Sequence, residues 1–166
     1  YDDDLKAVVT GTRDKVAEKM ADLRVADSMT EIFNLFRRCN RYIDETMPWV
    51  LAKDEASKDR LATVLYNLVE GITIGASLLS PYMPETSEKI FAQLNTSMVE
   101  FDNLATFGNY KSGTKVTEKP QILFARLDEK EVMEKAKVLM EKQAASVKAA
   151  NAAVEEDTVI DIEPKD

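Results

Sequence analysis

Apolar residues recur along the first 95 residues at the spacing of helices that each bury one face. Positions three or four apart share a face of an α-helix, so this spacing predicts amphipathic helices. The first spans residues 3–24 and the second spans about 27–45, with Asp27 or Ser28 as its N-cap. The buried side of the second helix is predicted to contain Met29, Ile32, Phe33, Phe36, Cys39, Asn40 and Ile43.

A proline interrupts this pattern after the second helix. Because Pro48 disfavours helical geometry in the residue before it, the helix should end within the two preceding residues. A corner follows, and it carries the only tryptophan, Trp49. The central core helix comes next, after a polar run in which Asp54 can cap, and its apolar stripe comprises Leu61, Val64, Leu65, Leu68, Ile72, Gly75, Leu78 and Leu79. Pro84 stands at the first position of a short helix that ends at Leu94.

Helices joined by short turns predict an all-α fold, an antiparallel helix bundle. We expect residues 1–95 to form this bundle and residues 96–126, with scattered glycine and proline and no helical period, to form an irregular docking segment. Residues 127–166 are expected to form a C-terminal helix and, from residue 155, an acidic linker. Asp128 and Glu131 make the D-x-x-E signal that starts this last helix.

Composition narrows the chemistry that the chain can perform. The chain has no histidine and a single cysteine, Cys39, which excludes a histidine-based triad, an internal disulfide and a thiolate zinc site. No glycine-rich phosphate loop occurs. A formal charge of -8 disfavours general nucleic-acid binding, so any RNA contact must be local. No apolar run approaches the roughly 20 residues that span a bilayer, and a cytoplasmic protein is expected.

Trp49 is the side chain with the clearest potential for binding. An exposed ring can stack on a nucleobase, which contributes about 1–3 kcal/mol per base. A half-buried structural anchor is the commoner situation for a lone tryptophan. The basic residues around the corner are Arg37, Arg38, Arg41, Lys53 and Arg60. Their concentration in an acidic chain favours an RNA contact, although pairing of the arginines with Asp44 and Glu45 explains the same spacing.

Two further polar positions on the second helix have a simpler interpretation. Asn40 is predicted on the buried side and stands four residues before Asp44, so a hydrogen-bonded pair across the bundle accounts for both. The consecutive acidic runs at residues 2–4 and 155–157 indicate solubility rather than acid–base chemistry.

The corner lies within residues 40–53, which read NRYIDETMPWVLAK. This stretch resembles the anticodon-binding domain of methionyl-tRNA synthetases, which are class I aminoacyl-tRNA synthetases. The resemblance covers most of residues 25–95, and further matching stretches are RLATVLYNL, LLSPYMPET and, more loosely, LFARLD. In the last of these, Ala125 stands where the family usually has proline.

The resemblance implies a helical bundle whose Pro48 and Trp49 corner meets the anticodon loop of methionine tRNA. Trp49 would stack on the first anticodon base, a cytosine. Asn40, Arg41 and Asp44 belong to the same motif and would line or support the corner. In the family, an asparagine and an arginine from an earlier helix bond to that base, and we expect that helix upstream of this chain.

The resemblance also implies chemistry and partners outside this chain. The parent enzyme would ligate methionine to its tRNA and cleave ATP to AMP and pyrophosphate. We expect no catalytic residue and no cofactor in this chain, because the ATP, the magnesium and a candidate zinc ion belong to the catalytic domain. The expected partners are tRNA, the rest of the parent chain and a C-terminal OB-type tRNA-binding domain, with no membrane.

Two other interpretations stay open. One is a helical protein-interaction or scaffold module in which Trp49 belongs to the core. The other is the anticodon domain of a sister class I synthetase, for cysteine or a branched aliphatic amino acid. The PWVLAK corner favours methionine over both. Full burial of Trp49 would remove the stacking role.

Overall fold

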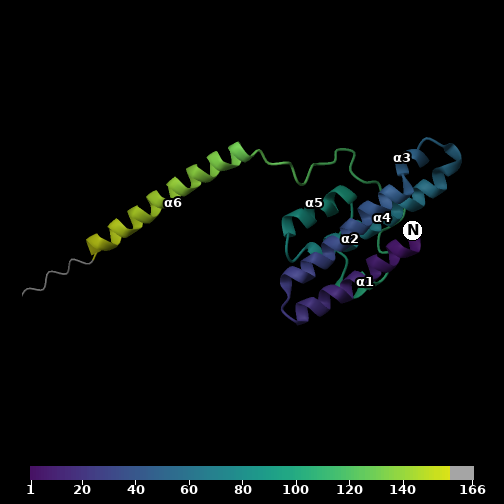
Figure 1. Cartoon of the computed structure of the whole chain (residues 1–166), viewed down its shortest axis with the longest axis horizontal. Helices are drawn as coiled ribbons and strands as arrows, with labels where there is room; N and C mark the ends of the chain where they lie inside the picture. The colour runs from purple at the N-terminus through teal and green to yellow at the C-terminus, as the bar shows by residue number, and fades with distance from the viewer. Residues whose placement is uncertain (158–166) are drawn as a thin grey trace, which may run out of the picture. The chain divides into compact units, whose positions relative to one another are not determined.

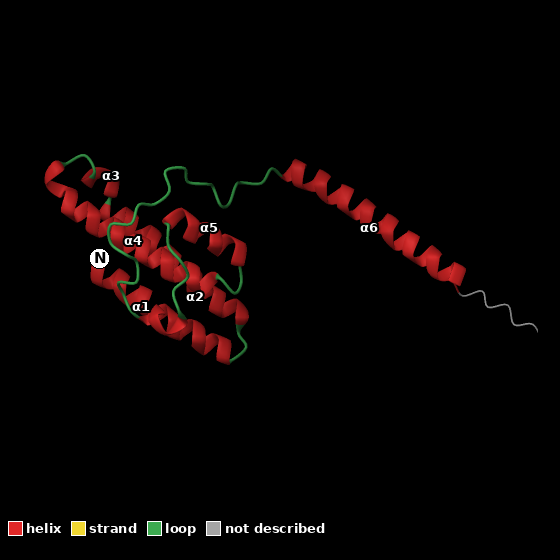
Figure 2. Cartoon of the chain, turned by 180° about the vertical axis from the view of Figure 1, so that it is seen from behind, coloured by secondary structure: helices red, strands yellow, loops and turns green. Residues whose placement is uncertain are grey.

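The computed structural model describes the backbone of residues 1–157 and the side chains of residues 1–148. The helices are α1 (Asp2–Ala21), α2 (Val25–Thr46), α3 (Pro48–Leu51), α4 (Lys58–Leu79), α5 (Pro84–Leu94) and α6 (Glu129–Asp157), with 3-10 turns η1 (Glu55–Ser57) and η2 (Phe101–Ala105) (Figures 1 and 2). No strand occurs in this part of the chain, and the predicted all-α fold is confirmed.

The chain divides into two compact units, residues 1–123 and residues 124–166. In the first unit, α1, α2 and α4 pack against one another and α5 packs on α4. The core consists of Leu5, Val9 and Val16 from α1, Ile32, Leu35, Cys39 and Tyr42 from α2, and Val64, Leu68, Ile74, Leu78 and Leu79 from α4, together with Leu104. Burial of each large apolar side chain stabilises the fold by about 1.5–3 kcal/mol.

Helix α2 begins two residues before the predicted start, and neither proposed N-cap residue caps it. Arg24 occupies the N-cap position without a side-chain hydrogen bond. Asp27 pairs with Arg24 at 2.7 Å, and the Ser28 hydroxyl donates to the carbonyl oxygen of Val25 at 2.7 Å. Ser28 is fully buried, where it shares a hydrogen bond of 2.6 Å with the Tyr82 hydroxyl. The contact with Tyr82, in the turn between α4 and α5, therefore explains why Ser28 is buried.

The buried face of α2 also differs from the prediction. It consists of Ser28, Ile32, Leu35, Cys39 and Tyr42, which follow the same three-and-four spacing on a neighbouring face. Asn40 is exposed and Phe33 is 39% exposed, so their predicted burial is wrong. The physical reason is that hydrogen bonds satisfy the hydroxyl groups of Ser28 and Tyr42, which lets these two polar residues take core positions.

Helix α4 is the central core helix, as predicted. Within the stretch Glu55–Leu79, a window of 18 residues has a mean hydropathy of 1.4, so this stretch is long and apolar enough to cross a membrane by length and composition, which corrects the expectation that no run approaches that length. However, 61% of that window is buried inside the bundle, and Asn67 and Glu70 are among its buried residues. Packing on several sides explains the apolar composition of this helix.

The segment after α5 docks on the bundle through a buried carboxylate. Glu70 on α4 is fully buried, and its two carboxylate oxygens accept hydrogen bonds from the backbone N–H groups of Gly108 (2.8 Å), Asn109 (2.7 Å) and Tyr110 (2.7 Å). The Tyr110 hydroxyl donates to the carbonyl oxygen of Leu94 at 2.7 Å. Charge-assisted bonds of this kind compensate a buried charge, so Glu70 anchors a segment that has almost no regular structure of its own.

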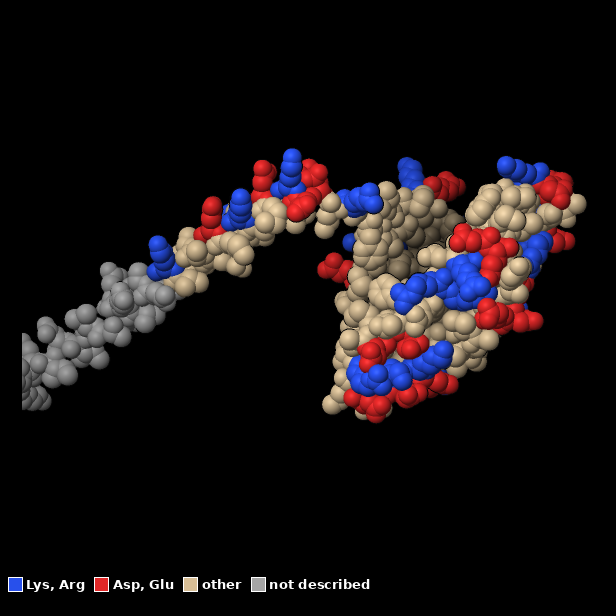
Figure 3. All heavy atoms as spheres, viewed as in Figure 1, with Lys and Arg blue, Asp and Glu red and all other residues tan. Residues whose placement is uncertain are grey.

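The second unit contains α6. Asp128 accepts hydrogen bonds from the backbone N–H groups of Lys130 (2.9 Å) and Glu131 (3.3 Å), so the predicted start signal is confirmed. Figure 3 shows the charged side chains of this helix along one edge and uncharged ones along the other. The backbone of residues 155–157, predicted as the start of the linker, is helical. The rest of the predicted linker, residues 158–166, lies outside the described residues.

Candidate nucleic-acid interface

A sharp reversal of the backbone builds the corner at the end of α2. Helix α2 ends at Thr46, as predicted, and the Met47 N–H donates to the carbonyl oxygen of Ile43 at 2.9 Å. Met47 adopts a left-handed conformation (φ 44°, ψ 61°), and Pro48 then takes the first position of α3. Proline fits there because its ring fixes φ near the helical value and that position needs no N–H donor. The corner lies at the end of the bundle where α1 begins (Figures 1 and 2).

Trp49 is the second residue of α3 and is 52% exposed. Its neighbours Met47 and Val50 are also about half exposed, at 46% and 48%, whereas Leu51 packs on the core. The cation–π contacts of the described residues involve other aromatic rings. The corner therefore presents an apolar, aromatic surface to solvent, supported from beneath by Leu51.

Asn40, Arg41 and Asp44 lie on the last two turns of α2, and all three are exposed. The predicted cross-bundle pair of Asn40 and Asp44 does not form, because both side chains face solvent. Arg41 donates to Glu45 at 2.9 Å as the spacing predicts, and its side chain is 77% exposed. These residues thus share the surface of the helix that enters the corner.

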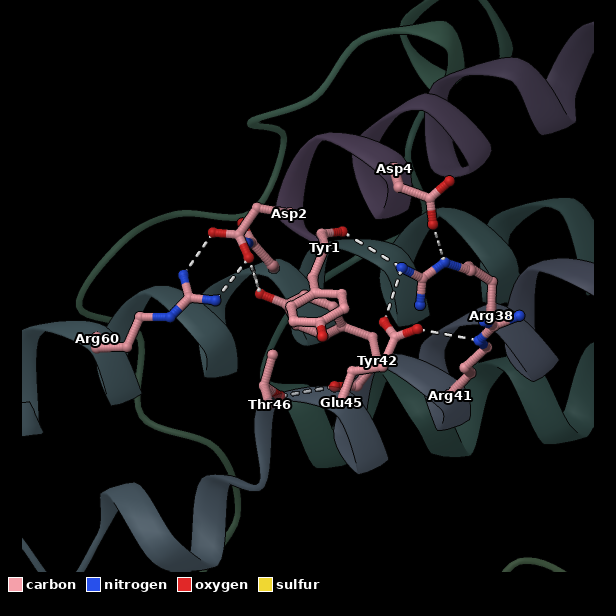
Figure 4. Close-up of polar contacts among 10 residues, drawn as sticks. Tyr1, Asp2, Asp4, Arg38, Arg41, Tyr42, Glu45, Thr46 and Arg60 are labelled. Carbon is pink, nitrogen blue, oxygen red and sulfur yellow. Dashed lines mark hydrogen bonds and ion pairs between the residues drawn. The ribbon is translucent and has the colours of Figure 1, made fainter.

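The basic residues near the corner do not form one positive surface. The Arg38 side chain is only 10% exposed and lies between Asp4 (2.6 Å) and Glu45 (3.1 Å). Arg60 forms two hydrogen bonds with Asp2. The acidic run at residues 2–4 was interpreted as a solubility feature, and this is wrong for Asp2 and Asp4, because both pair with arginines of other helices (Figure 4).

Asp2 is the centre of a polar network that joins α1, α2 and α4. Its carboxylate accepts hydrogen bonds from the Tyr42 hydroxyl (2.7 Å) and from both terminal nitrogens of Arg60 (2.5 and 2.8 Å). The Asn67 side-chain amide donates to the Tyr42 oxygen at 3.1 Å. Sequence reasoning missed this network. Its signal was the three-and-four spacing that places Tyr42 on the buried face, where its hydroxyl requires a partner.

The network shifts the titration of its members. The Arg60 guanidinium, through its hydrogen bonds, lowers the pKa of Asp2 from 3.8 to about 2, and the Tyr42 hydroxyl adds to this effect. Burial is the largest cause that raises the pKa of Tyr42 above its usual value. The Asp2 carboxylate therefore stays ionised throughout the neutral range.

The lowered pKa of Asp2 predicts how stability depends on pH. Because the folded-state pKa lies below the unfolded value, the contribution of Asp2 is fully present above pH 3.8 and is lost as the pH falls through about 2. We expect Asp2→Asn to cost about 1–2 kcal/mol at pH 7, since partial exposure of the pair reduces the full linkage value. Urea unfolding at pH 7, 4 and 2.5 measures this difference, which should shrink toward the lowest pH. Asp3→Asn, an exposed neighbour, is the control, and a pH-independent difference for Asp2→Asn would contradict the assignment.

Fold and corner together define an all-helical domain that presents a half-exposed tryptophan between two helices of a bundle. A family model described as the anticodon binding domain of methionyl tRNA ligase matches residues 1–144. A methionine–tRNA ligase of Clostridium tetani is 48% identical over 76% of this chain and 20% of its own length, and one of Clostridium acetobutylicum is 38% identical over 99% of this chain and 26% of its own.

Solved structures indicate the same family as the curated relatives. The methionyl-tRNA synthetase of Mycobacterium tuberculosis, in complex with methionyl-adenylate, superposes with a TM-score of 0.64 at 27% identity, over 75% of this chain and 25% of that chain. The chain belongs to the family of anticodon-binding domains of methionyl-tRNA ligases. It spans about a fifth to a quarter of the length of these relatives.

Proposed function

We propose that the chain recognises the anticodon of methionine tRNA and that Trp49 stacks on the first anticodon base, a cytosine. The observation that carries this proposal is the 52% exposure of Trp49 on a corner whose underside is packed on the core. Membership of the anticodon-binding family supports RNA as the ligand. A scaffold in which Trp49 belongs to the core is not supported by this exposure.

The neighbours of Trp49 have distinct roles in the proposal. Pro48 shapes the corner by fixing its own φ after the left-handed Met47. Arg41 offers an exposed guanidinium for a phosphate or base contact. Asn40 and Asp44 line the surface of α2 on the approach to the corner, and the exposure of Asn40 makes its amide accessible to RNA.

Charge and stacking energy together predict weak binding by this chain alone. Stacking of one base contributes about 1–3 kcal/mol, which is less than the roughly 4 kcal/mol that corresponds to millimolar affinity. Phosphate contacts must supply the remainder, yet the net charge is -8 and Lys and Arg are interspersed with Asp and Glu on the face in Figure 3.

We expect the chain to bind a methionine anticodon stem–loop with a Kd above about 10 µM at physiological salt, and more tightly as salt is lowered. Fluorescence titration or filter retention measures both. A stem–loop of the same length with an unrelated anticodon is the control and should bind more weakly. Binding below about 0.1 µM at physiological salt, or equal affinity for the two loops, would contradict the proposal.

The parent protein, we propose, ligates methionine to its tRNA with cleavage of ATP to AMP and pyrophosphate. ATP, magnesium and the candidate zinc ion would bind to parts of the parent outside this chain, since the chain corresponds to only 20–26% of its curated relatives. Proposed partners are tRNA, the rest of the parent chain and an OB-type domain. A cytoplasmic setting suits the single cysteine, Cys39, which is a free and buried thiol.

A further inference from the structure

A single carboxylate connects the two ends of the loop that carries Trp49. Residues 47–57 link α2 to α4, and Trp49 lies in this loop. Tyr42 lies in the last turns of α2, before the loop, and Arg60 lies in the first turn of α4, after it. Asp2 of α1 accepts hydrogen bonds from both side chains, at 2.5–2.8 Å, and Figure 4 shows the three side chains converging.

We propose that Asp2, Tyr42 and Arg60, which we name the Asp2 clamp, are positioning residues that hold the corner in the orientation in which Trp49 can stack on a base. The clamp does not contact RNA. It acts by holding together the two ends of the loop that carries Trp49. This inference rests on the proposed function of Trp49 as an anticodon platform.

The corner has few stabilising contacts of its own. Helix α3 has four residues, none of them fully buried, and so short a helix is not stable in isolation. The left-handed conformation of Met47 is unfavourable for a non-glycine residue. Only Leu51 joins the core from this helix. The orientation of Trp49 must therefore depend strongly on where the two ends of the loop are fixed.

The clamp is suited to fix those ends. Tyr42 is fully buried, and its hydroxyl donates to Asp2 while it accepts from Asn67, so packing holds the ring and two hydrogen bonds hold the hydroxyl. Arg60 binds the same carboxylate through two nitrogens, a geometry that restricts the direction of the guanidinium. Because a preorganised site loses less conformational entropy on binding, the clamp should increase affinity for the anticodon.

Fluorescence of this chain tests the clamp directly, because Trp49 is its only tryptophan. In Tyr42→Phe, which removes one hydroxyl from the clamp, we expect faster decay of Trp49 anisotropy on the nanosecond timescale and roughly threefold to tenfold weaker binding of the methionine anticodon stem–loop. Arg60→Met should act in the same direction, and Arg60→Lys should recover part of the loss. The double variant Tyr42→Phe/Arg60→Met should be less than additive, since both residues act through Asp2.

Tyr82→Phe is the matched control. It also removes a tyrosine hydroxyl that bonds to α2, because Tyr82, in the turn between α4 and α5, pairs with Ser28 at 2.6 Å. Ser28 lies about four turns before Tyr42, or roughly 21 Å along the axis of α2. We expect Tyr82→Phe to lower Tm by about as much as Tyr42→Phe does. The anisotropy of Trp49 and the stem–loop affinity should nevertheless stay unchanged.

The possible outcomes distinguish failure of the clamp proposal from failure of the proposed stacking function of Trp49. If Trp49→Ala weakens stem–loop binding but the clamp variants change neither anisotropy nor affinity, the clamp is wrong and the function stands. Equal losses in Tyr42→Phe and Tyr82→Phe also overturn the clamp, because they indicate general stability. If Trp49→Ala has no effect on binding, the proposed function fails, and the clamp, as a device for stacking, fails with it.

Discussion

Trp49→Ala in a synthetase that contains this domain is expected to lower discrimination for the methionine anticodon by roughly 10-fold to 100-fold. The physical reason is the loss of base stacking, which contributes about 1–3 kcal/mol. Stability should decrease by only about 1 kcal/mol, because the side chain is half exposed and leaves little cavity. The measurement is kcat/KM for aminoacylation of methionine tRNA and of the same tRNA with its first anticodon base changed.

Two variants control this experiment. Trp49→Phe keeps an aromatic face and should retain part of the discrimination. Phe101→Ala removes an aromatic side chain of similar exposure, 54%, from η2 and should change discrimination little. A large loss of stability in Trp49→Ala together with unchanged anticodon preference would show that Trp49 is a structural anchor.

Glu70→Gln is expected to have the largest effect on stability, a loss of about 2–3 kcal/mol. Both oxygens of Glu70 accept hydrogen bonds from backbone N–H groups, one from Gly108 and Asn109 and the other from Tyr110. Glutamine replaces one of these oxygens with an NH₂ group, which must then face a backbone donor. At least one buried donor loses its partner, and the docked segment should loosen. Urea unfolding followed by circular dichroism measures the loss.

Glu88→Gln provides the comparison for Glu70. Glu88 is an exposed glutamate on α5, and the same substitution there should change the free energy of unfolding by less than about 0.5 kcal/mol. Hydrogen exchange adds a local measurement, because the amides of Gly108 to Tyr110 should lose protection in Glu70→Gln. Substitutions at exposed positions usually change the free energy of unfolding by about 0.5 kcal/mol or less. If Glu70→Gln lowers it by no more than this, the anchor role is wrong.

Local signals in the sequence were sufficient for the helix boundaries that proline determines. Pro48 and Pro84 restrict their own φ and the preceding residue, so the end of α2 and the start of α5 follow from the chain itself. The corner that carries Trp49 follows from the same rule, whereas the 52% exposure of its ring is known only from the structure. The stacking role of Trp49 comes from resemblance, because exposure alone identifies no ligand.

Partners distant in the sequence determine what the pattern could not predict. Tyr42 takes a core position on α2 because Asp2 and Asn67 satisfy its hydroxyl, and a hydropathy pattern does not include such partners. Glu70 is buried because the backbone near residue 109 donates to it from 39 residues away. Asp2 looked like a solubility residue for the same reason, since Arg60 lies 58 residues further along the chain.

Quenching of Trp49 fluorescence by RNA tests the central claim most directly. Stacking on a nucleobase should quench the only tryptophan of this chain as a methionine anticodon stem–loop is added. The decisive comparison is a stem–loop with an abasic residue at the first anticodon position, with one that is abasic at the third position as the control. We predict that saturating RNA quenches Trp49 unless the first anticodon base is missing. Equal quenching by the two abasic loops, or no quenching when binding is saturated by an independent measurement, would contradict the account.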